Sequence, residues 1–211
     1  MSGKITEIKM ILLGESGVGK TSIIKRYLHD KFDLNETSTL SMNYVGKIIE
    51  IKGQKIQLNI WDTIGQEKYR SISKLFLNET KIVMLVYSII SKRSFDELEY
   101  WYNLYKDLLG EETILGIAGN KMDLYLEQEI SEEKGKEFAD ERGAFFSLLS
   151  AKNDKESIDR FIQTLLKAYL NKSEPKSEKI KGHKNTIKLE ENKIQENQKD
   201  EGCCSSKKRR K

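Results

Sequence analysis

Residues 14–21 read GESGVGKT, a glycine-rich stretch that matches the pattern G-x-x-x-x-G-K-[ST]. The apolar run at residues 8–13 directly before it predicts a strand, and the apolar spacing after Lys20 predicts a helix. Backbone N–H groups at such a helix N-terminus bind phosphate oxygens. We therefore predict a phosphate-binding loop in which Lys20 adds a cation and the Thr21 hydroxyl binds Mg²⁺. The predicted contact residues are Ser16, Gly17, Val18, Gly19, Lys20, Thr21 and Ser22.

Strand-like and helical stretches alternate along residues 1–171, which predicts a mainly parallel sheet with helices on both faces. The expected strands cover residues 8–13, 44–51, 55–61, 82–87, 114–118 and 144–149, and the later helices are expected at residues 94–109, from the cap Ser131 to Gly143, and at 158–170. A short connection at residues 52–54 joins the second and third strands, so one antiparallel pairing is expected there. The fold class is α/β with a six-stranded sheet, and ligands should bind beyond the carboxyl ends of the strands.

Residues 120–123, NKMD, follow a buried strand and supply an amide and a carboxylate where a purine can lie. The Asp123 carboxylate can accept two hydrogen bonds from an N–H and an exocyclic amine, which guanine presents and adenine does not. Together with the phosphate loop, Asn120, Lys121 and Asp123 predict a site for a guanine nucleotide.

Residues 61–67, WDTIGQE, close the third strand. Asp62 at the strand end can hold a water molecule bound to Mg²⁺, the Gly65 N–H can meet a terminal phosphate, and Gln66 can orient an attacking water. This stretch therefore predicts nucleotide hydrolysis.

Over residues 5–171, the motifs GESGVGKT, WDTIGQE and NKMD come in an order that resembles small GTPases of the Ras superfamily. Within that superfamily the chain is most similar to the Rab family, which KYRSIS at residues 68–73 and LVYSI at 85–89 also resemble. The resemblance implies a P-loop NTPase G domain that binds GTP and GDP with Mg²⁺ and hydrolyses GTP slowly until an activating protein supplies an arginine. Arg26 and Arg70 are not placed by the motifs to act in that role.

The resemblance also assigns roles to residues outside the first motifs. Thr39 would coordinate Mg²⁺ and the terminal phosphate, so Gln66, Lys20 and Thr39 form the implied catalytic set. Phe32 would pack against guanine. The stretch of Ser150, Ala151 and Lys152 resembles the last guanine-binding loop of the family, in which the Ala151 N–H would meet the base. Exchange factor, activating protein, effectors and a prenyl-binding GDP-dissociation inhibitor are the implied partners, and regulation of vesicle trafficking is the implied role.

Ile64 stands where the family normally has Ala. A stiff β-branched side chain there predicts slow hydrolysis or hindered closure of the second switch. The alternative function is therefore a guanine-nucleotide-binding scaffold or membrane tether that hydrolyses GTP poorly. A P-loop kinase for a small molecule is a third interpretation, which leaves NKMD unexplained and which GTP-over-ATP preference would test.

Residues 172–211 hold 13 Lys and Arg against 7 Asp and Glu, whereas residues 1–171 hold 24 against 26. This composition predicts a flexible, basic, hypervariable tail after the G domain and argues against nucleic-acid binding by the folded part. Cys203 and Cys204 resemble the paired prenylated cysteines of Rab proteins, although seven residues follow Cys204. Apolar runs are too short to span a membrane, so we expect a cytoplasmic protein that cycles to an intracellular membrane through its lipids and basic tail.

Overall fold

The computed structural model describes residues 5–36, 39, 43–63, 77–110 and 112–173 of the 211-residue chain. The chain divides into two compact units, Met1–Pro175 and Lys176–Lys211. All described residues lie in the first unit.

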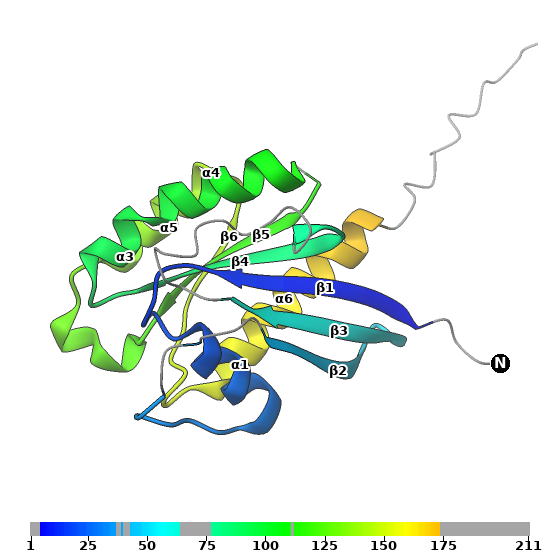
Figure 1. The fold of residues 1–211 in the computed structure, drawn as a ribbon, viewed down its shortest axis with the longest axis horizontal. Coiled ribbons are helices and arrows are strands. Elements are labelled where there is room, and N and C mark those ends of the chain that lie inside the picture. Colours follow the sequence, from blue (N-terminus) through cyan, green and yellow to red (C-terminus); the bar gives the residue numbers. More distant parts are fainter. Residues whose placement is uncertain (1–4, 37–38, 40–42, 64–76, 111, 174–211) are drawn as a thin grey trace, which may run out of the picture. The chain divides into compact units, whose positions relative to one another are not determined.

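A six-stranded sheet forms the centre of this unit, in the order β2-β3-β1-β4-β5-β6 (Figure 1). Its strands are β1 Thr6–Leu13, β2 Asn43–Ile51, β3 Gln54–Asp62, β4 Thr80–Ser88, β5 Ile114–Asn120 and β6 Phe145–Leu148. β2 and β3 pair antiparallel across the short turn between them, and the other four pairings are parallel. The predicted fold class is confirmed.

Helices cover both faces of the sheet (Figure 1). One face carries α1 Lys20–His29 and α6 Lys155–Ser173, and the other carries α3 Lys92–Asp96, α4 Leu98–Leu109 and α5 Glu132–Asp140. A 3₁₀ helix, η2 Met122–Glu127, follows β5. Within the described ranges, no helix has the length and apolar character that crossing a bilayer requires.

The side chains of β1 point alternately to the two faces of the sheet, which explains why there are two hydrophobic cores. Ile8, Met10 and Leu12 are buried in the cluster that α1 and α6 cover, whereas Ile11 and Leu13 are buried in the cluster under α3, α4 and α5. Successive side chains of a strand point to opposite faces, so the part of a central strand that is covered on both sides is apolar at every residue, as β1 is from Met10 to Leu13. β1 is therefore held firmly from both faces up to the residue where the glycine-rich loop begins.

The helix expected at residues 94–109 is two helices. Ser91 starts the first helix at Lys92 because its side chain accepts a hydrogen bond from the Ser94 amide, and Glu97 separates this helix from α4. The helix expected after Ser131 does begin there, with the Ser131 hydroxyl accepting from the Lys134 amide at 3.3 Å. Capping side chains thus set both helix starts.

The parallel strands end at one edge of the sheet. The loops that follow Leu13 in β1, Asp62 in β3, Asn120 in β5 and Leu148 in β6 therefore lie at that edge. Ligands of α/β sheets bind at such an edge, and the predicted motifs lie there.

Candidate functional site: a nucleotide pocket at the sheet edge

The glycine-rich loop connects β1 to α1 and has left-handed backbone at three glycines. At Gly14 φ is 144°, and a Cβ there would lie 2.1 Å from the Val86 carbonyl oxygen in β4. Glycine is therefore required at residue 14, both by its φ and by the close approach of the neighbouring strand. The turn at Gly14 leads the loop to the N-terminus of α1, where backbone N–H groups bind anions.

Lys20 is the first residue of α1 and folds back over the loop. Its Nζ donates hydrogen bonds to the carbonyl oxygens of Gly14, at 2.7 Å, and Glu15, at 2.9 Å. Burial lowers the pKa of Lys20 to about 8, against the opposing effect of the Asp62 and Glu15 carboxylates. A phosphate group nearby would favour the charged ammonium, so this site gains electrostatically from binding an anion.

Three oxygen-bearing side chains meet beside the loop. Thr21 Oγ1 lies 2.7 Å from Asp62 Oδ2, to which it donates a hydrogen bond, and 2.7 Å from Thr39 Oγ1. The second Asp62 oxygen, Oδ1, is buried and has no hydrogen-bond partner within the described part of the chain. Burial raises the pKa of Asp62, while the Thr21 hydrogen bond and the Lys20 charge oppose that rise. A cation at this place would therefore stabilise the Asp62 carboxylate.

Asn120 links the phosphate loop to the 150–153 loop. Its Nδ2 donates to the Val18 carbonyl at 2.8 Å, and its Oδ1 accepts from the Ala151 amide at 3.2 Å. The contact is close, since a Cβ at Gly19 would lie 2.4 Å from Nδ2. A buried amide that uses both ends in this way fixes the distance between the two loops, one of which lies 102 residues before Asn120 and the other 31 residues after it.

Asp123 is held in place from one side. The Ser150 hydroxyl donates to Asp123 Oδ1 at 2.6 Å and also accepts from the Asn153 amide at 3.0 Å. Lys121 has a left-handed backbone, and burial lowers the pKa of its side chain against the opposing charge of Asp123. Because Ser150 occupies Oδ1, the carboxylate is oriented before any ligand arrives.

These groups surround one cavity of about 370 Å³, within the usual size range of small-molecule sites. Its lining contains thirteen of the predicted site residues: Ser16, Gly17, Gly19, Lys20, Thr21, Ser22, Phe32, Thr39, Asn120, Lys121, Asp123, Ala151 and Lys152. Val18, Asp62 and Ser150 stand behind this lining and hold its residues through the hydrogen bonds described above. In this structure the Ala151 amide donates to Asn120, while Ala151 itself lines the cavity.

Five lining residues were not predicted from the sequence. They are Asp33, Leu34, Glu36, Thr63 and Leu124. Leu34 is 77% exposed, and because single exposed leucines are common on protein surfaces, its sequence carried no signal for a site. The predicted residues Gly65, Gln66, Cys203 and Cys204, and also Ile64, lie outside the described residues.

Comparison with known proteins agrees with this geometry. The Ras family, as a sequence family, matches residues 9–171. The Ras-related protein Rab-21 of Geodia cydonium is 37% identical over 167 residues, which are 79% of this chain and 72% of that protein. Human Rab-21 is 31% identical over 213 aligned residues, covering 97% of this chain and 94% of that protein. Mouse Rab-12 is 36% identical over 167 residues, covering 79% of this chain and 68% of that protein.

The family match includes the phosphate loop, Asp62, NKMD and residues 150–152 in a single alignment. The sheet order and the cavity place these same segments around one pocket. The chain therefore belongs to the Ras family: it is a small GTPase, an enzyme that hydrolyses GTP to GDP, and its similarity lies with the Rab proteins.

Proposed function

We propose that this chain binds GTP and GDP in the cavity at the sheet edge and works as a molecular switch. The observation that carries the proposal is the single cavity shared by Lys20 and Thr21 at one end and by Asn120 and Asp123 at the other. The first end offers a cation and helix-terminal N–H groups for phosphates. The second end offers a fixed carboxylate acceptor for guanine, with Phe32 in the cavity wall.

Mg²⁺ fits the oxygen groups of Thr21, Thr39 and Asp62. Hydroxyl and carboxylate oxygens are the donors that this ion prefers, together with substrate phosphates. The buried Asp62 Oδ1 has a hydrogen-bonding need that no described residue meets. When bound, Mg²⁺ would offset the negative charge of the phosphates. Thr21, Thr39 and Asp62 would bind the ion. Thr39 belongs to the loop between α1 and β2, and its hydroxyl connects that loop to the metal site through Thr21.

Removal of divalent metal is expected to speed GDP release about tenfold or more, because Asp62 and the phosphates would then repel each other directly. The measurement is the release of a fluorescent GDP analogue with excess Mg²⁺ and with a chelator. In Asp62→Ala the chelator should have a smaller effect, since the repelling carboxylate is gone. Equal release rates with and without metal in the wild-type chain would contradict this role of the three oxygens.

For hydrolysis we propose that Gln66 orients the attacking water and that the Gly65 N–H meets the terminal phosphate, while Lys20 and Thr39 hold that phosphate. Catalysis of this kind depends on positioning and on charge stabilisation. An arginine from an activating protein would add roughly 10³ to 10⁵ in rate.

Gln66→Leu is expected to slow single-turnover GTP hydrolysis at least tenfold without weakening GTP binding, because leucine cannot hydrogen-bond a water. Purified protein is loaded with GTP and Mg²⁺, and the bound nucleotide is followed by chromatography. Gln163→Leu, an exposed glutamine in α6, is the matched control and should hydrolyse at the wild-type rate. Bound GTP that stays intact in the wild-type chain would instead favour the alternative of a static tether, for which Ile64 is the specific observation.

In the cell, we propose a Rab-like role in vesicle trafficking, in which GTP-bound protein binds effectors. The Rab relatives and the C-terminal Cys203 and Cys204 beside a basic segment support this role. The proposed organisation is a G domain over residues 1–171 and a flexible tail over 172–211, of which the first two residues, Lys172 and Ser173, continue α6. Lipids on the two cysteines would hold the protein on the cytoplasmic face of an intracellular membrane, between cycles with an exchange factor, an activating protein and a prenyl-binding GDP-dissociation inhibitor.

A further inference from the structure

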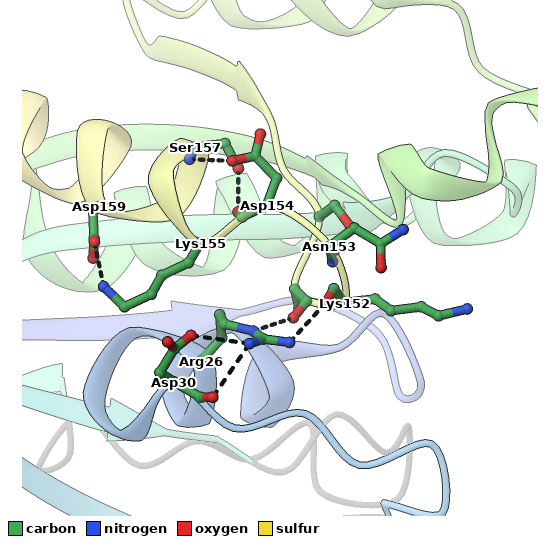
Figure 2. A network of polar contacts seen from close by, with 10 residues as sticks. Arg26, Asp30, Lys152, Asn153, Asp154, Lys155, Ser157 and Asp159 are labelled. Carbon is green, nitrogen blue, oxygen red and sulfur yellow. Dashed lines mark hydrogen bonds and ion pairs between the residues drawn. The ribbon is translucent and has the colours of Figure 1, made fainter.

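Arg26 lies in the last turns of α1 and reaches across to the 150–153 loop, 125 residues later in the sequence. Its Nε donates to the Ala151 carbonyl at 2.8 Å, and its Nη2 donates to the Lys152 carbonyl at 2.7 Å. Figure 2 shows the guanidinium between the helix and this loop, with the dashed contacts running to the main chain at Lys152. Charge-assisted hydrogen bonds of this length are the strong ones.

The third nitrogen of the same guanidinium binds the end of its own helix. Nη1 donates to Asp30 Oδ1 at 3.0 Å and to the Asp30 carbonyl at 3.3 Å (Figure 2). Asp30 has a left-handed backbone, with φ at 53°, and ends α1 two residues before Phe32. Arg26 thus contacts Asp30, two residues before the lining residue Phe32, and the main chain of the lining residues Ala151 and Lys152.

The 150–153 loop is already shaped by its own hydrogen bonds. The Asp154 amide donates to the Ser150 carbonyl at 3.0 Å, and Asp154 Oδ1 accepts from the Ser157 amide at the start of α6. These contacts are local and define the turn. The local contacts do not fix the distance of the 150–153 loop from α1, whereas the bonds from Arg26 to the Ala151 and Lys152 carbonyls do.

The Arg26 side chain is only 17% exposed. A guanidinium presents its donors in a planar fork, so it can hold two successive carbonyls and a carboxylate at once, which a lysine ammonium cannot reproduce. By comparison, the side chain of Lys25, which forms an ion pair with Glu36, is 46% exposed, and surface pairs of this kind contribute little.

We propose that Arg26 is a positioning residue for the guanine base: by tying the 150–153 loop to α1, it sets how slowly bound nucleotide leaves. The inference rests on the proposed nucleotide site. Arg26 touches the cavity wall from behind and is not among the lining residues. Its loss should therefore loosen the base end of the site, while the phosphate and metal end, built from Lys20 and Thr21, stays intact.

The test is the release rate of a fluorescent GDP analogue from Arg26→Ala, Arg26→Gln and Arg26→Lys in the full chain with Mg²⁺. We expect Arg26→Ala to release nucleotide about tenfold or more faster, because both charge-assisted bonds to the 150–153 loop are lost. Arg26→Lys should fall between Arg26→Ala and wild type. Single-turnover hydrolysis of GTP that is still bound should stay within about twofold of wild type, which a general structural loss would not allow.

Two controls separate the parts of the network. Asp30→Ala removes the carboxylate contact but leaves the bonds from Arg26 to the Ala151 and Lys152 carbonyls, so it should speed nucleotide release only about twofold. Arg160→Ala removes an exposed arginine from α6 and should release nucleotide at the wild-type rate. If Asp30→Ala matches Arg26→Ala, the arginine acts through its own helix end and the proposal is overturned.

The set of Arg26 variants distinguishes a loss of folding from a loss of nucleotide retention. Should Arg26→Ala fail to fold, Arg26→Gln and Arg26→Lys carry the test, since each retains a donor. Wild-type release rates in folded Arg26 variants would overturn the inference and leave the nucleotide site standing. A wild-type chain that binds no guanine nucleotide would overturn the proposed function itself.

Discussion

Asp123→Asn is expected to weaken GDP binding roughly a thousandfold, because the substitution replaces an acceptor with a donor opposite the guanine N–H groups. The Ser150 hydroxyl donates to Oδ1, so an amide at residue 123 would keep its oxygen toward Ser150 and turn its NH₂ toward the base. The amide NH₂ would then face the N–H groups of guanine, so a donor would meet donors. Competition of unlabelled GDP against a fluorescent analogue measures the loss.

The same substitution should raise the affinity for XDP relative to GDP. Xanthine carries a carbonyl where guanine carries its exocyclic amine, so an amide donor at residue 123 meets an acceptor. Asp140→Asn, an exposed aspartate in α5, makes the same chemical change outside the cavity and should leave both affinities unchanged. If Asp123→Asn keeps the wild-type preference for GDP over XDP, the Asp123 carboxylate does not determine which base binds.

Gly14→Ala is expected to lower the free energy of unfolding by about 3 kcal/mol or more. The new Cβ would lie 2.1 Å from the Val86 carbonyl oxygen, and φ at residue 14 is 144°. Backbone strain of this kind costs roughly 1 to 3 kcal/mol, and forcing extra atoms into a packed interior costs a similar amount. Val86 belongs to the central strand β4, so the clash cannot be relieved at the surface. Urea unfolding at one fixed GDP concentration measures the change.

Gly53→Ala is the matched control. Gly53 also has a positive φ, of 75°, but a Cβ there has no heavy atom within 4 Å. Only the cost of the left-handed backbone remains, about 1 kcal/mol. Comparable losses in the two variants would show that φ alone, and not the approach of β4, makes residue 14 a glycine.

Much of the site was predictable because its motifs stand next to clear strands. The apolar run of β1 and the helical spacing after Lys20 place GESGVGKT in its structural context, and NKMD follows β5 in the same way. Parallel strands bring these segments to one edge, so their meeting follows from topology. The sequence order alone therefore brings Thr21 and Asp123 to one pocket.

Side-chain direction was not predictable in the same way. Nothing in NKMD shows that the Asn120 amide turns back to the Val18 carbonyl, because that depends on the distance between two loops. In the sequence, Arg26 is one more cation on a predicted helix, and the motifs do not place it as a catalytic arginine. Its contact with the main chain at residues 151 and 152 depends on how α1 packs beside α6. Long-range contacts to backbone carbonyls leave no residue pattern.

The central place of β1 has a consequence for synthesis of the chain. Thr6–Leu13 leaves the ribosome first, but its two neighbours in the sheet, β3 and β4, end only at Asp62 and Ser88. Neither edge of this strand can pair until β3 has emerged, about 50 residues later, and the second edge waits for β4, about 75 residues after Leu13. Parallel pairing over such a separation forms slowly. The nascent chain therefore exposes Thr6–Leu13 until its neighbours in the sheet have emerged, and the nucleotide pocket can form only after that.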